Sequence, residues 1–191
     1  MASLFEPYAP RHDDDPQKRP AESLHIDLAV AEDERAIAEL IAQREGEDPQ
    51  RAGDRVRRWL AAPAEVQRTF VARLENTVVG FARACRVSNT PDQATASERV
   101  PEGWYLMGLI VAPPIRRQGV GITLTRYRLD WLAGRTDEVF YFANSKNLAS
   151  IDLHQRCGFV PVQENFTFPG ASFSAGGHGV LYRAGLCRQA T

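Results

Sequence analysis

The sequence has almost no net charge and few cysteines. Its 23 Lys and Arg side chains are matched by 24 Asp and Glu side chains, which leaves a formal net charge of −1 over 191 residues. Such a balance gives no reason to expect nucleic acid or an anionic membrane surface as a partner. The three cysteines, Cys85, Cys157 and Cys187, are widely spaced and form no CxxC pair. This spacing favours reduced thiols in a cytoplasmic protein over disulfides or a metal site.

Long hydrophobic runs are also missing. No apolar stretch approaches the roughly 20 residues that a membrane-spanning helix needs, and the N-terminus has neither the basic region nor the apolar core of a secretion signal. Residues 1–22 contain four prolines and the acidic run Asp13 to Asp15, which predicts a flexible N-terminal arm. Residues 23–191 are enough to bury one hydrophobic core and are predicted to form a single domain.

The apolar pattern after the arm alternates between a period of two and a period of 3.6 residues. The polar, proline-containing segment 88–103 is predicted to be a loop. In the helix predicted for 119–134, Val120, Leu124, Tyr127 and Trp131 fall on one face, which we expect to be buried. The order of elements, β-α-α-β-β-β-α-β-α-β-β, predicts an α/β sandwich. Strands are predicted at 24–30, 70–74, 78–87, 104–112, 139–143, 159–167 and 179–184, and helices at 32–44, 51–61, 119–134 and 148–157. The second and third strands are predicted to form a hairpin around residues 75–77, and Gly46 is predicted to end the first helix.

Residues 109–121 contain the most informative local pattern. A short apolar strand ends at a double proline, and two arginines then lead through Gly119 and Gly121 into a helix. The first amides of a helix lack carbonyl partners and lie at the positive end of its dipole, and glycine lets the backbone come close to a ligand. Arg116 and Arg117 add two permanent cations. The segment is therefore predicted to bind an anion, and a pyrophosphate-bearing cofactor fits it best.

Two common nucleotide motifs do not fit this segment. A P-loop needs a lysine before its Ser or Thr, which is missing before Thr123, and a dinucleotide fingerprint needs a third glycine where Leu124 stands. The segment 116–121, Arg-x-x-Gly-x-Gly, instead resembles the pyrophosphate loop of the GNAT superfamily of acetyl-CoA-dependent N-acetyltransferases. The preceding segment 109–113, Leu-x-Val-x-Pro, is similar to that family's central strand.

A second segment carries the same resemblance. Residues 147–159 begin with Asn147, continue with Ser150 and end with Gly-Phe, which is similar to the family's second cofactor motif. One departure is His154, which stands where many members of the family carry tyrosine. The resemblance extends over about residues 24–185.

The resemblance implies a fold and a co-substrate. The implied fold is a GNAT-type α/β fold, with a mixed, mostly antiparallel central sheet flanked by helices and a splayed central strand pair at 104–112 and 139–143. Acetyl-CoA is the implied co-substrate, and backbone amides freed by the splaying would bind its pantetheine arm and thioester carbonyl. An ordinary core strand is the alternative for 104–112. The residues assigned to acetyl-CoA are Leu109, Ile110 and Val111, then Arg116, Arg117, Gln118, Gly119, Val120, Gly121 and Ile122, and finally Asn147, Ser150 and His154.

The last three of these residues fall within one helical arc. Asn147, Ser150 and His154 are spaced at i, i+3 and i+7, which brings them onto one side of a helix. The resemblance assigns His154 the role of the family's tyrosine, general acid toward the departing thiolate. An imidazole with a pKa of about 6.5 can exchange protons at neutral pH. A packing or capping histidine is the alternative.

The general base is less well defined by the sequence. Residues 104–112 contain no carboxylate, and Tyr105 has too high an ordinary pKa to act as a base at neutral pH. Glu102, just before the strand, is a catalytic candidate, as is a water chain ending on His154. A solvated loop glutamate is the alternative for Glu102.

Acidic residues gather in the segments that form the acceptor pocket in the family. An acid-rich rim would attract a cationic amine, although charged surface loops are common. The Gly- and Phe-rich tail 166–179 loosely resembles small-molecule members of the family, including antibiotic-resistance enzymes that acetylate aminoglycosides such as kasugamycin. Trp59 and Trp104 are candidates for the pocket lining or for the core. The acidic residues are Glu45, Glu47, Asp48, Asp92, Glu98, Glu102 and Glu164.

The sequence therefore predicts a cytoplasmic enzyme that transfers an acetyl group from acetyl-CoA to a primary amine. The expected acceptor is a small cationic molecule that attacks directly in a ternary complex, and neither nucleic acid nor a membrane is expected as a partner. The resemblance makes a homodimer plausible. A protein or peptide acceptor, and a non-catalytic module that binds acyl-CoA, are the alternatives.

Overall fold

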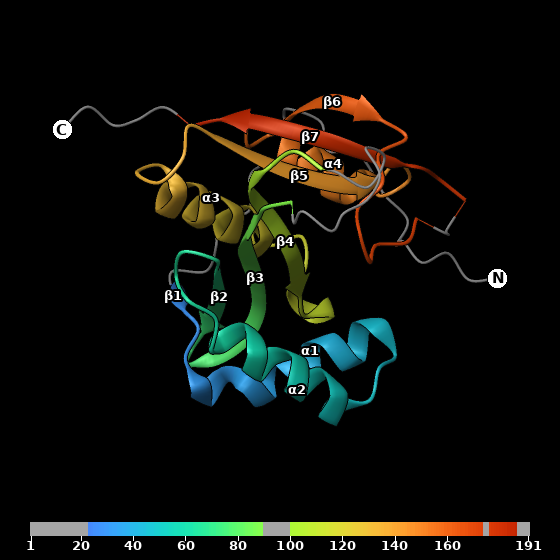
Figure 1. Ribbon diagram of the computed structural model, residues 1–191. Helices are drawn as coiled ribbons and strands as arrows, with labels where there is room; N and C mark the ends of the chain where they lie inside the picture. Colours follow the sequence, from blue (N-terminus) through green and yellow to red (C-terminus); the bar gives the residue numbers. More distant parts are fainter. Residues whose placement is uncertain (1–22, 90–99, 174–175, 187–191) are drawn as a thin grey trace. The chain divides into compact units, whose positions relative to one another are not determined.

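The computed structural model describes residues 23–89, 100–173 and 176–186, so the predicted arm at 1–22 lies outside the described part of the chain. Within the described part, the chain forms two compact units, and Figure 1 shows their elements. The N-terminal unit combines 23–86 with 106–132, and the C-terminal unit combines 87–89, 100–105, 133–173 and 176–186.

Three strands of the N-terminal unit form an antiparallel ladder. They are β1 (Leu24–Leu28), β2 (Gln67–Leu74) and β3 (Thr77–Val87). The β2–β3 hairpin turns at Glu75 and Asn76, whose φ angles of 48° and 68° are those of the left-handed residues in a type I′ turn. The hairpin predicted from the sequence is confirmed.

The first long helix lies between β1 and β2. α1 (Glu34–Glu45) follows a single 3-10 turn at Ala31–Asp33. The Asp33 carboxylate stabilises this start, because it accepts a backbone amide at 2.9 Å and binds the guanidinium of Arg73 at 2.8 Å. α1 ends where the sequence predicts, at Gly46, whose left-handed φ of 67° favours glycine.

The second helix begins earlier than predicted. α2 (Pro49–Leu60) starts at Pro49 rather than at 51, because the Asp48 side chain accepts hydrogen bonds from the amides of Gln50 and Arg51 and so caps the helix. Proline at the first helical position strengthens this start, since its ring already has the helical φ. α1 and α2 pack against each other.

Side chains alternate between the two faces of the N-terminal strands, as extended backbone requires. Val71 of β2 belongs to a buried cluster with residues of α1 and α2. Its neighbour Phe70 faces the other side, where its ring lies 5.8 Å from that of Tyr127 and 5.7 Å from that of Trp131 on α3 (Val120–Leu132). Helices therefore cover both faces of these strands. The cluster comprises Ile37, Ala38, Leu40, Ile41, Ala52, Val56, Val71, Phe81 and Ile110.

The predicted apolar face of α3 is only partly correct. Val120 and Leu124 are buried as expected, but Tyr127 is 39% exposed and Trp131 is partly exposed. Tyr127 packs its ring edge against Phe70 and leaves much of its surface in solvent. Helical periodicity gives the direction of a side chain but does not show how far the neighbouring element extends over it.

The buried residue that periodicity missed on α3 is Arg128. It has no exposed surface and donates hydrogen bonds to the carbonyl oxygens of Leu124 and Arg83, at 3.3 and 3.1 Å, and to the Thr125 hydroxyl at 2.9 Å. A pattern of apolar residues assigns arginine to the surface. These acceptors allow the guanidinium to be buried, since each satisfies one of its donors.

The C-terminal unit is built around two antiparallel strands, β5 (Glu138–Asn144) and β7 (Gly179–Gly185). β6 (Val160–Glu164) pairs antiparallel with β7, and α4 (Leu148–Gln155) connects β5 to β6. β6 ends before the predicted 167, because Asn165 takes a left-handed φ of 52° and leaves the ladder.

Strand β4 (Gly103–Val111) belongs to both units, since the division falls after Tyr105. It pairs parallel with β5, and the register joins Trp104 to Val139 and Tyr105 to Phe140. The ladder with β5 contains these two residue pairs, whereas β4 itself continues to the end of its range.

The predicted fold class is confirmed. The hydrogen-bonded strand order, followed through β4, is β1-β2-β3-β4-β5-β7-β6, and β4 and β5 form the parallel pair of an otherwise antiparallel sheet. The order of helices and strands along the chain is the predicted one. Among the described helices, none is both long and apolar enough to cross a membrane.

We expect Arg128→Ala to lower the free energy of unfolding by about 3 kcal/mol, because the substitution leaves a cavity and removes the donor from three buried acceptors. Urea denaturation measures this change. Arg126→Ala, at an exposed position of the same helix, is the control and should change stability by less than about 0.5 kcal/mol. Equally small losses in the two variants would show that Arg128 does not stabilise the unit.

Candidate functional site

The chain turns sharply between β4 and α3. It forms one 3-10 turn at Pro113–Ile115, after which Arg117 and Gly119 adopt left-handed φ angles of 63° and 86°. The amide of Thr123 then donates to the Gly119 carbonyl at 3.0 Å. The amides of 120–122 therefore come before this first helical hydrogen bond, at the end of a helix where anions are stabilised.

Side-chain hydrogen bonds hold the path of this turn. Arg116 Nε donates to the Val111 carbonyl at 3.0 Å, and Gln118 Nε2 donates to the Pro114 carbonyl at 3.0 Å. The turn is thus tied back to the end of β4 and to the 3-10 turn. The guanidinium groups of Arg116 and Arg117 bring two permanent positive charges to the same segment.

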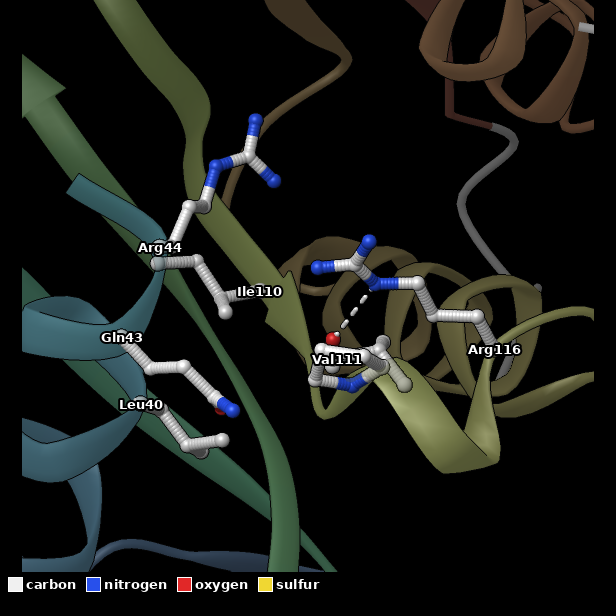
Figure 2. A pocket seen from close by; sticks show the side chains of 7 residues that line it. Leu40, Gln43, Arg44, Ile110, Val111 and Arg116 are labelled. Carbon is white, nitrogen blue, oxygen red and sulfur yellow. Dashed lines mark hydrogen bonds between the residues drawn. The ribbon is translucent and has the colours of Figure 1, made fainter. Parts of the chain in front are cut away.

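A pocket lies beside the turn, between α1 and the end of β4 (Figure 2). Leu40, Ile110 and Val111 contribute apolar lining. Figure 2 shows the guanidinium groups of Arg44 and Arg116 on the same side of these apolar residues.

The residues assigned to the thioester lie on the last part of β4. Residues 109–111 follow the end of the parallel ladder at Tyr105. On the other edge β3 comes close, because a Cβ at Gly80 would lie 2.9 Å from the Ile110 carbonyl oxygen. β4 is therefore held by β3 along this stretch, while its ladder with β5 has already ended.

The second predicted segment begins after β5, in the C-terminal unit. Asn147 is the N-cap of α4, and its Oδ1 accepts the amide of Ser150 at 3.4 Å. The Tyr141 hydroxyl of β5 donates to Ser150 Oγ at 2.6 Å, which orients that serine. Both Asn147 and Ser150 are partly buried.

His154 lies one turn beyond Ser150 and is 1% exposed. Its ring stacks on Tyr141, with centroids 3.6 Å apart and planes inclined by 6°, and it lies edge-on to Phe159 at 5.4 Å. His154 Nδ1 is 2.8 Å from the Ser150 carbonyl oxygen, which accepts only from an N–H, so this nitrogen carries a proton. The His154 ring is therefore packed against aromatic neighbours, and Nε2 is the ring nitrogen that does not contact the Ser150 carbonyl oxygen.

A comparison with protein families agrees with both segments. The model of the Acetyltransferase (GNAT) family matches residues 33–159, which include the turn after β4 and the whole of α4. The chain belongs to the GNAT family of acetyltransferases. The predicted family, its enzyme class and its co-substrate acetyl-CoA are thereby confirmed.

Solved structures of other GNAT proteins show the same fold. The ribosomal-protein-alanine N-acetyltransferase from Brucella melitensis has a TM-score of 0.63 and 19% identity, over 85% of this chain and 99% of that protein. A phosphinothricin acetyltransferase from Sinorhizobium meliloti, solved in complex with AcCoA, has a TM-score of 0.63 and 17% identity, over 86% of this chain and 89% of that protein. These identities establish the fold alone.

A curated relative matches a shorter stretch. The protein named "Probable N-acetyltransferase HLS1-like" from Arabidopsis thaliana is 40% identical over 58 residues. The match covers 29% of this chain and 14% of the relative, so this chain corresponds to a small part of that protein's length.

Carboxylates of the predicted acidic rim have partners within their own units. Glu45 and Glu47 both accept hydrogen bonds from Arg55, at 2.9 and 2.5 Å. Glu164 lies 2.6 Å from His178 Nε2. A carboxylate that is already paired attracts a cationic ligand less strongly. The acidic rim therefore supports a cationic acceptor less than the sequence suggests. Of the remaining rim residues, Asp48 caps α2, and Asp92 and Glu98 lie outside the described residues.

Glu102, the candidate base, is exposed just before β4. Its Oε1 accepts the backbone amide of Asn89 at 3.0 Å and the Asn89 side-chain amide at 3.3 Å. Asn89 also donates to the Val100 carbonyl at 3.0 Å. Glu102 therefore helps to hold the two ends of the predicted 88–103 loop together, in addition to any catalytic role.

Tyr105 is buried at the end of the parallel ladder, and its hydroxyl donates to the Pro101 carbonyl at 2.7 Å. Burial raises the pKa of its phenol above the ordinary value, because the charged form would lose its hydration. Tyr105 therefore stays protonated at neutral pH, and its exclusion as a base agrees with the structure.

Sequence reasoning missed residues that lie next to the predicted ones. Gly108, with a φ of 62°, interrupts β4 directly before Leu109, and the Arg83 guanidinium lies against it. Tyr141 stacks on His154 in the C-terminal unit. A glycine within a strand pattern is a signal for an irregular strand and could have indicated Gly108. The two side-chain contacts are tertiary and leave no pattern in the sequence.

We expect the free energy of unfolding of Tyr105→Phe to fall less steeply with pH in the alkaline range than that of the wild-type protein. The Tyr105 phenol stays protonated in the folded protein, whereas in the unfolded chain it loses its proton once the pH exceeds about 10. The stability from this source is present below that pH and is lost above it. Urea unfolding between about pH 9 and 11 measures the slope. Tyr127→Phe, with its exposed ring, should keep the wild-type slope, and three equal slopes would contradict the prediction.

Proposed function

We propose that this protein transfers the acetyl group of acetyl-CoA to a primary amine of a small cationic molecule, by direct attack of the amine in a ternary complex. The observation that carries the proposal is the turn at 116–122, where two arginines and left-handed Gly119 lead from β4 directly into a helix start. Such a turn supports binding of a diphosphate by backbone amides. Membership of the GNAT family supports acetyl-CoA as the ligand that carries this diphosphate.

The residues that we assign to acetyl-CoA lie on three segments of the chain. In the N-terminal unit, the backbone of 109–111 is assigned to the pantetheine arm and thioester carbonyl, and residues 116–122 to the diphosphate. In the C-terminal unit, Asn147 and Ser150 are assigned to the pantetheine amides. The fit is supported by the oriented Ser150 hydroxyl and by the end of the β4–β5 ladder before residue 109.

Acetyl-CoA supplies the acetyl group as a thioester. When the amine attacks the thioester carbonyl carbon, a C–N bond forms and the C–S bond breaks. The backbone N–H groups of 109–111 are the proposed donors to the carbonyl oxygen, and such donors contribute about 3 kcal/mol when negative charge develops there. His154 Nε2 is proposed to give a proton to the leaving sulfur. Because Nδ1 holds the proton of the neutral ring, Nε2 must first receive one, and it receives the proton of the amine where the water chain ends on His154. Glu102, or a water chain ending on His154, is proposed to take the proton that the amine loses.

The described thiols support direct attack over an acyl-enzyme. Cys85 Sγ donates to Gln67 Oε1 at 3.4 Å, and burial raises the pKa of this thiol, so it stays protonated and weakly nucleophilic. Cys157 lies beyond the end of α4, beside Gly158, where the resemblance implies a structural position. Neither of these two cysteines forms a disulfide.

An aminoglycoside-type antibiotic is the specific acceptor that we propose to test first, in line with the tail at 166–179. The names of similar structures point to other acceptors as well, phosphinothricin in one and a ribosomal-protein alanine in another. A panel of aminoglycosides, polyamines, amino acids and peptides, read by release of free thiol from acetyl-CoA, separates these classes. Release that requires both acetyl-CoA and an amine supports the proposal. Binding of acetyl-CoA without release over the whole panel would favour a non-catalytic acyl-CoA-binding module.

Gly119→Val is expected to abolish binding of acetyl-CoA, because a β-branched side chain is strained at a φ of 86° and the backbone amides would have to turn away. Calorimetry with acetyl-CoA measures the loss. Gly134→Ala is the control, since Gly134 is not left-handed and has open space around it. Undiminished binding by Gly119→Val would overturn the assignment of the turn.

His154→Phe is expected to lower turnover about 100-fold, and to lower turnover more than it lowers the affinity for acetyl-CoA. Phenylalanine can keep the stack on Tyr141 but has no proton to give. Gln155→Ala, exposed on the same helix, is the control for helix stability. Equal turnover in wild type and His154→Phe would remove His154 from the mechanism and leave it a packing residue.

A further inference from the structure

Arg83 is a partly buried charge in the N-terminal unit that the proposed mechanism does not use. Its guanidinium carbon lies 3.7 Å from the centre of the Trp59 ring, and Nη1 donates to Gln67 Oε1 at 3.2 Å. Its Nε is buried and has no hydrogen-bond partner in the described part of the chain. Buried donors are almost always satisfied, so an exception of this kind needs an explanation.

The nearby carboxylates do not neutralise Arg83. Glu45 and Glu47 both bind Arg55, which itself lies 5.4 Å from the centre of the same Trp59 ring. Burial is the main cause that lowers the pKa of Arg83. Cys85 raises this pKa, the positive charge of Arg55 lowers it, and Glu45 raises it. An arginine nevertheless stays protonated at neutral pH. Among the described residues, no carboxylate forms an ion pair with it.

Arg83 also lies against the strand that we assign to the acetyl group. Gly108 has a φ of 62°, and a Cβ at this position would lie 3.1 Å from Arg83 Nε, so a side chain here would press on the guanidinium. Gly108 is exposed and directly precedes Leu109. A ligand that contacts Arg83 at this point would therefore lie beside the backbone proposed to hold the thioester carbonyl.

We propose that Arg83, held by Gln67 and by the ring of Trp59, binds a carboxylate of the acceptor, so that the acceptor is an amine that also carries a carboxylate. The inference rests on the proposed acetyl transfer to an amine, and it specifies an amino-acid-like acceptor in place of the aminoglycoside. A guanidinium presents parallel N–H donors that match a carboxylate, and the indole face holds its plane.

The charge balance around the indole favours a monoanion. Arg55, the second cation over Trp59, is already paired with Glu45 and Glu47, so Arg83 alone has a charge to share with a ligand. A phosphate group carries nearly two charges and is usually bound by several cations. A carboxylate therefore fits the site better, and a carboxylate-bearing amine also agrees with a rim whose acids are already occupied.

Matched pairs of acceptors test this inference. Each L-amino acid and its α-carboxamide present the same amine and side chain and differ in the carboxylate. We expect wild-type protein to release thiol from acetyl-CoA with a kcat/KM at least about tenfold higher for the amino acid, which corresponds to one charge-assisted contact. Arg83→Gln should lose this preference, and Arg83→Lys should keep only part of it.

Two further variants complete the experiment. Arg86→Gln, exposed on the same strand, is the control and should keep the wild-type preference. Gln67→Glu places a carboxylate beside Arg83 Nη1, so it should abolish the preference even if Arg83→Gln fails to fold. Equal rates on amino acids and carboxamides, or acetylation of aminoglycosides alone, would overturn the inference and leave the proposed function intact.

Absence of thiol release with every amine would instead contradict the proposed function. The inference is then decided by calorimetry with the L-amino acids. Binding to wild type that Arg83→Gln loses supports the carboxylate site, and no binding to wild type overturns it.

Discussion

Strand β4 pairs with β5 over two residue pairs, and this short ladder determines where a ligand can use the backbone of the central strand. Beyond Tyr105 the strand is held along its other edge by β3, where Gly80 allows the two backbones to approach closely. The same stretch contains left-handed Gly108, the segment 109–111 and then the turn into α3. Backbone conformation rather than side-chain chemistry therefore defines the proposed cofactor site, which explains why its central residues need only be apolar.

Two arginines in the N-terminal unit differ in how completely their surroundings satisfy their hydrogen-bond donors. Arg128 is fully buried, and three acceptors of its own unit satisfy its donors. The carbonyl of Arg83 is one of those acceptors. The Arg83 guanidinium lies against Trp59, and its Nε has no hydrogen-bond partner among the residues that the structure describes. The first arrangement is complete without a ligand. The second leaves a donor for which we propose an anion, and this difference is the physical basis for assigning a carboxylate to the acceptor.

Much of the fold could be predicted from the sequence because local chemistry determines it. The order of elements, the end of α1 at Gly46 and the hairpin at Glu75 and Asn76 all follow from periodicity and left-handed residues. The start of α2 differs from the prediction because Asp48 and Pro49 cap the helix two residues before its apolar periodicity begins.

The candidate site was predictable only in part. The turn at 116–122 could be found because adjacent residues build it. Arg83 and the stack of Tyr141 on His154 could not, since both depend on contacts between elements far apart in the chain. The role of His154 also depends on its surroundings. Its position on α4 agrees with a general acid, while its burial and its bond to Ser150 are equally those of a core histidine.

The most direct test of the central claim is a crystal structure of the protein with acetyl-CoA. The account predicts electron density for the diphosphate within hydrogen-bond distance of the amides of 118–122, with the thioester carbonyl beside the backbone of 109–111. A diphosphate bound elsewhere, with the turn after β4 making no contact to the nucleotide, would contradict it.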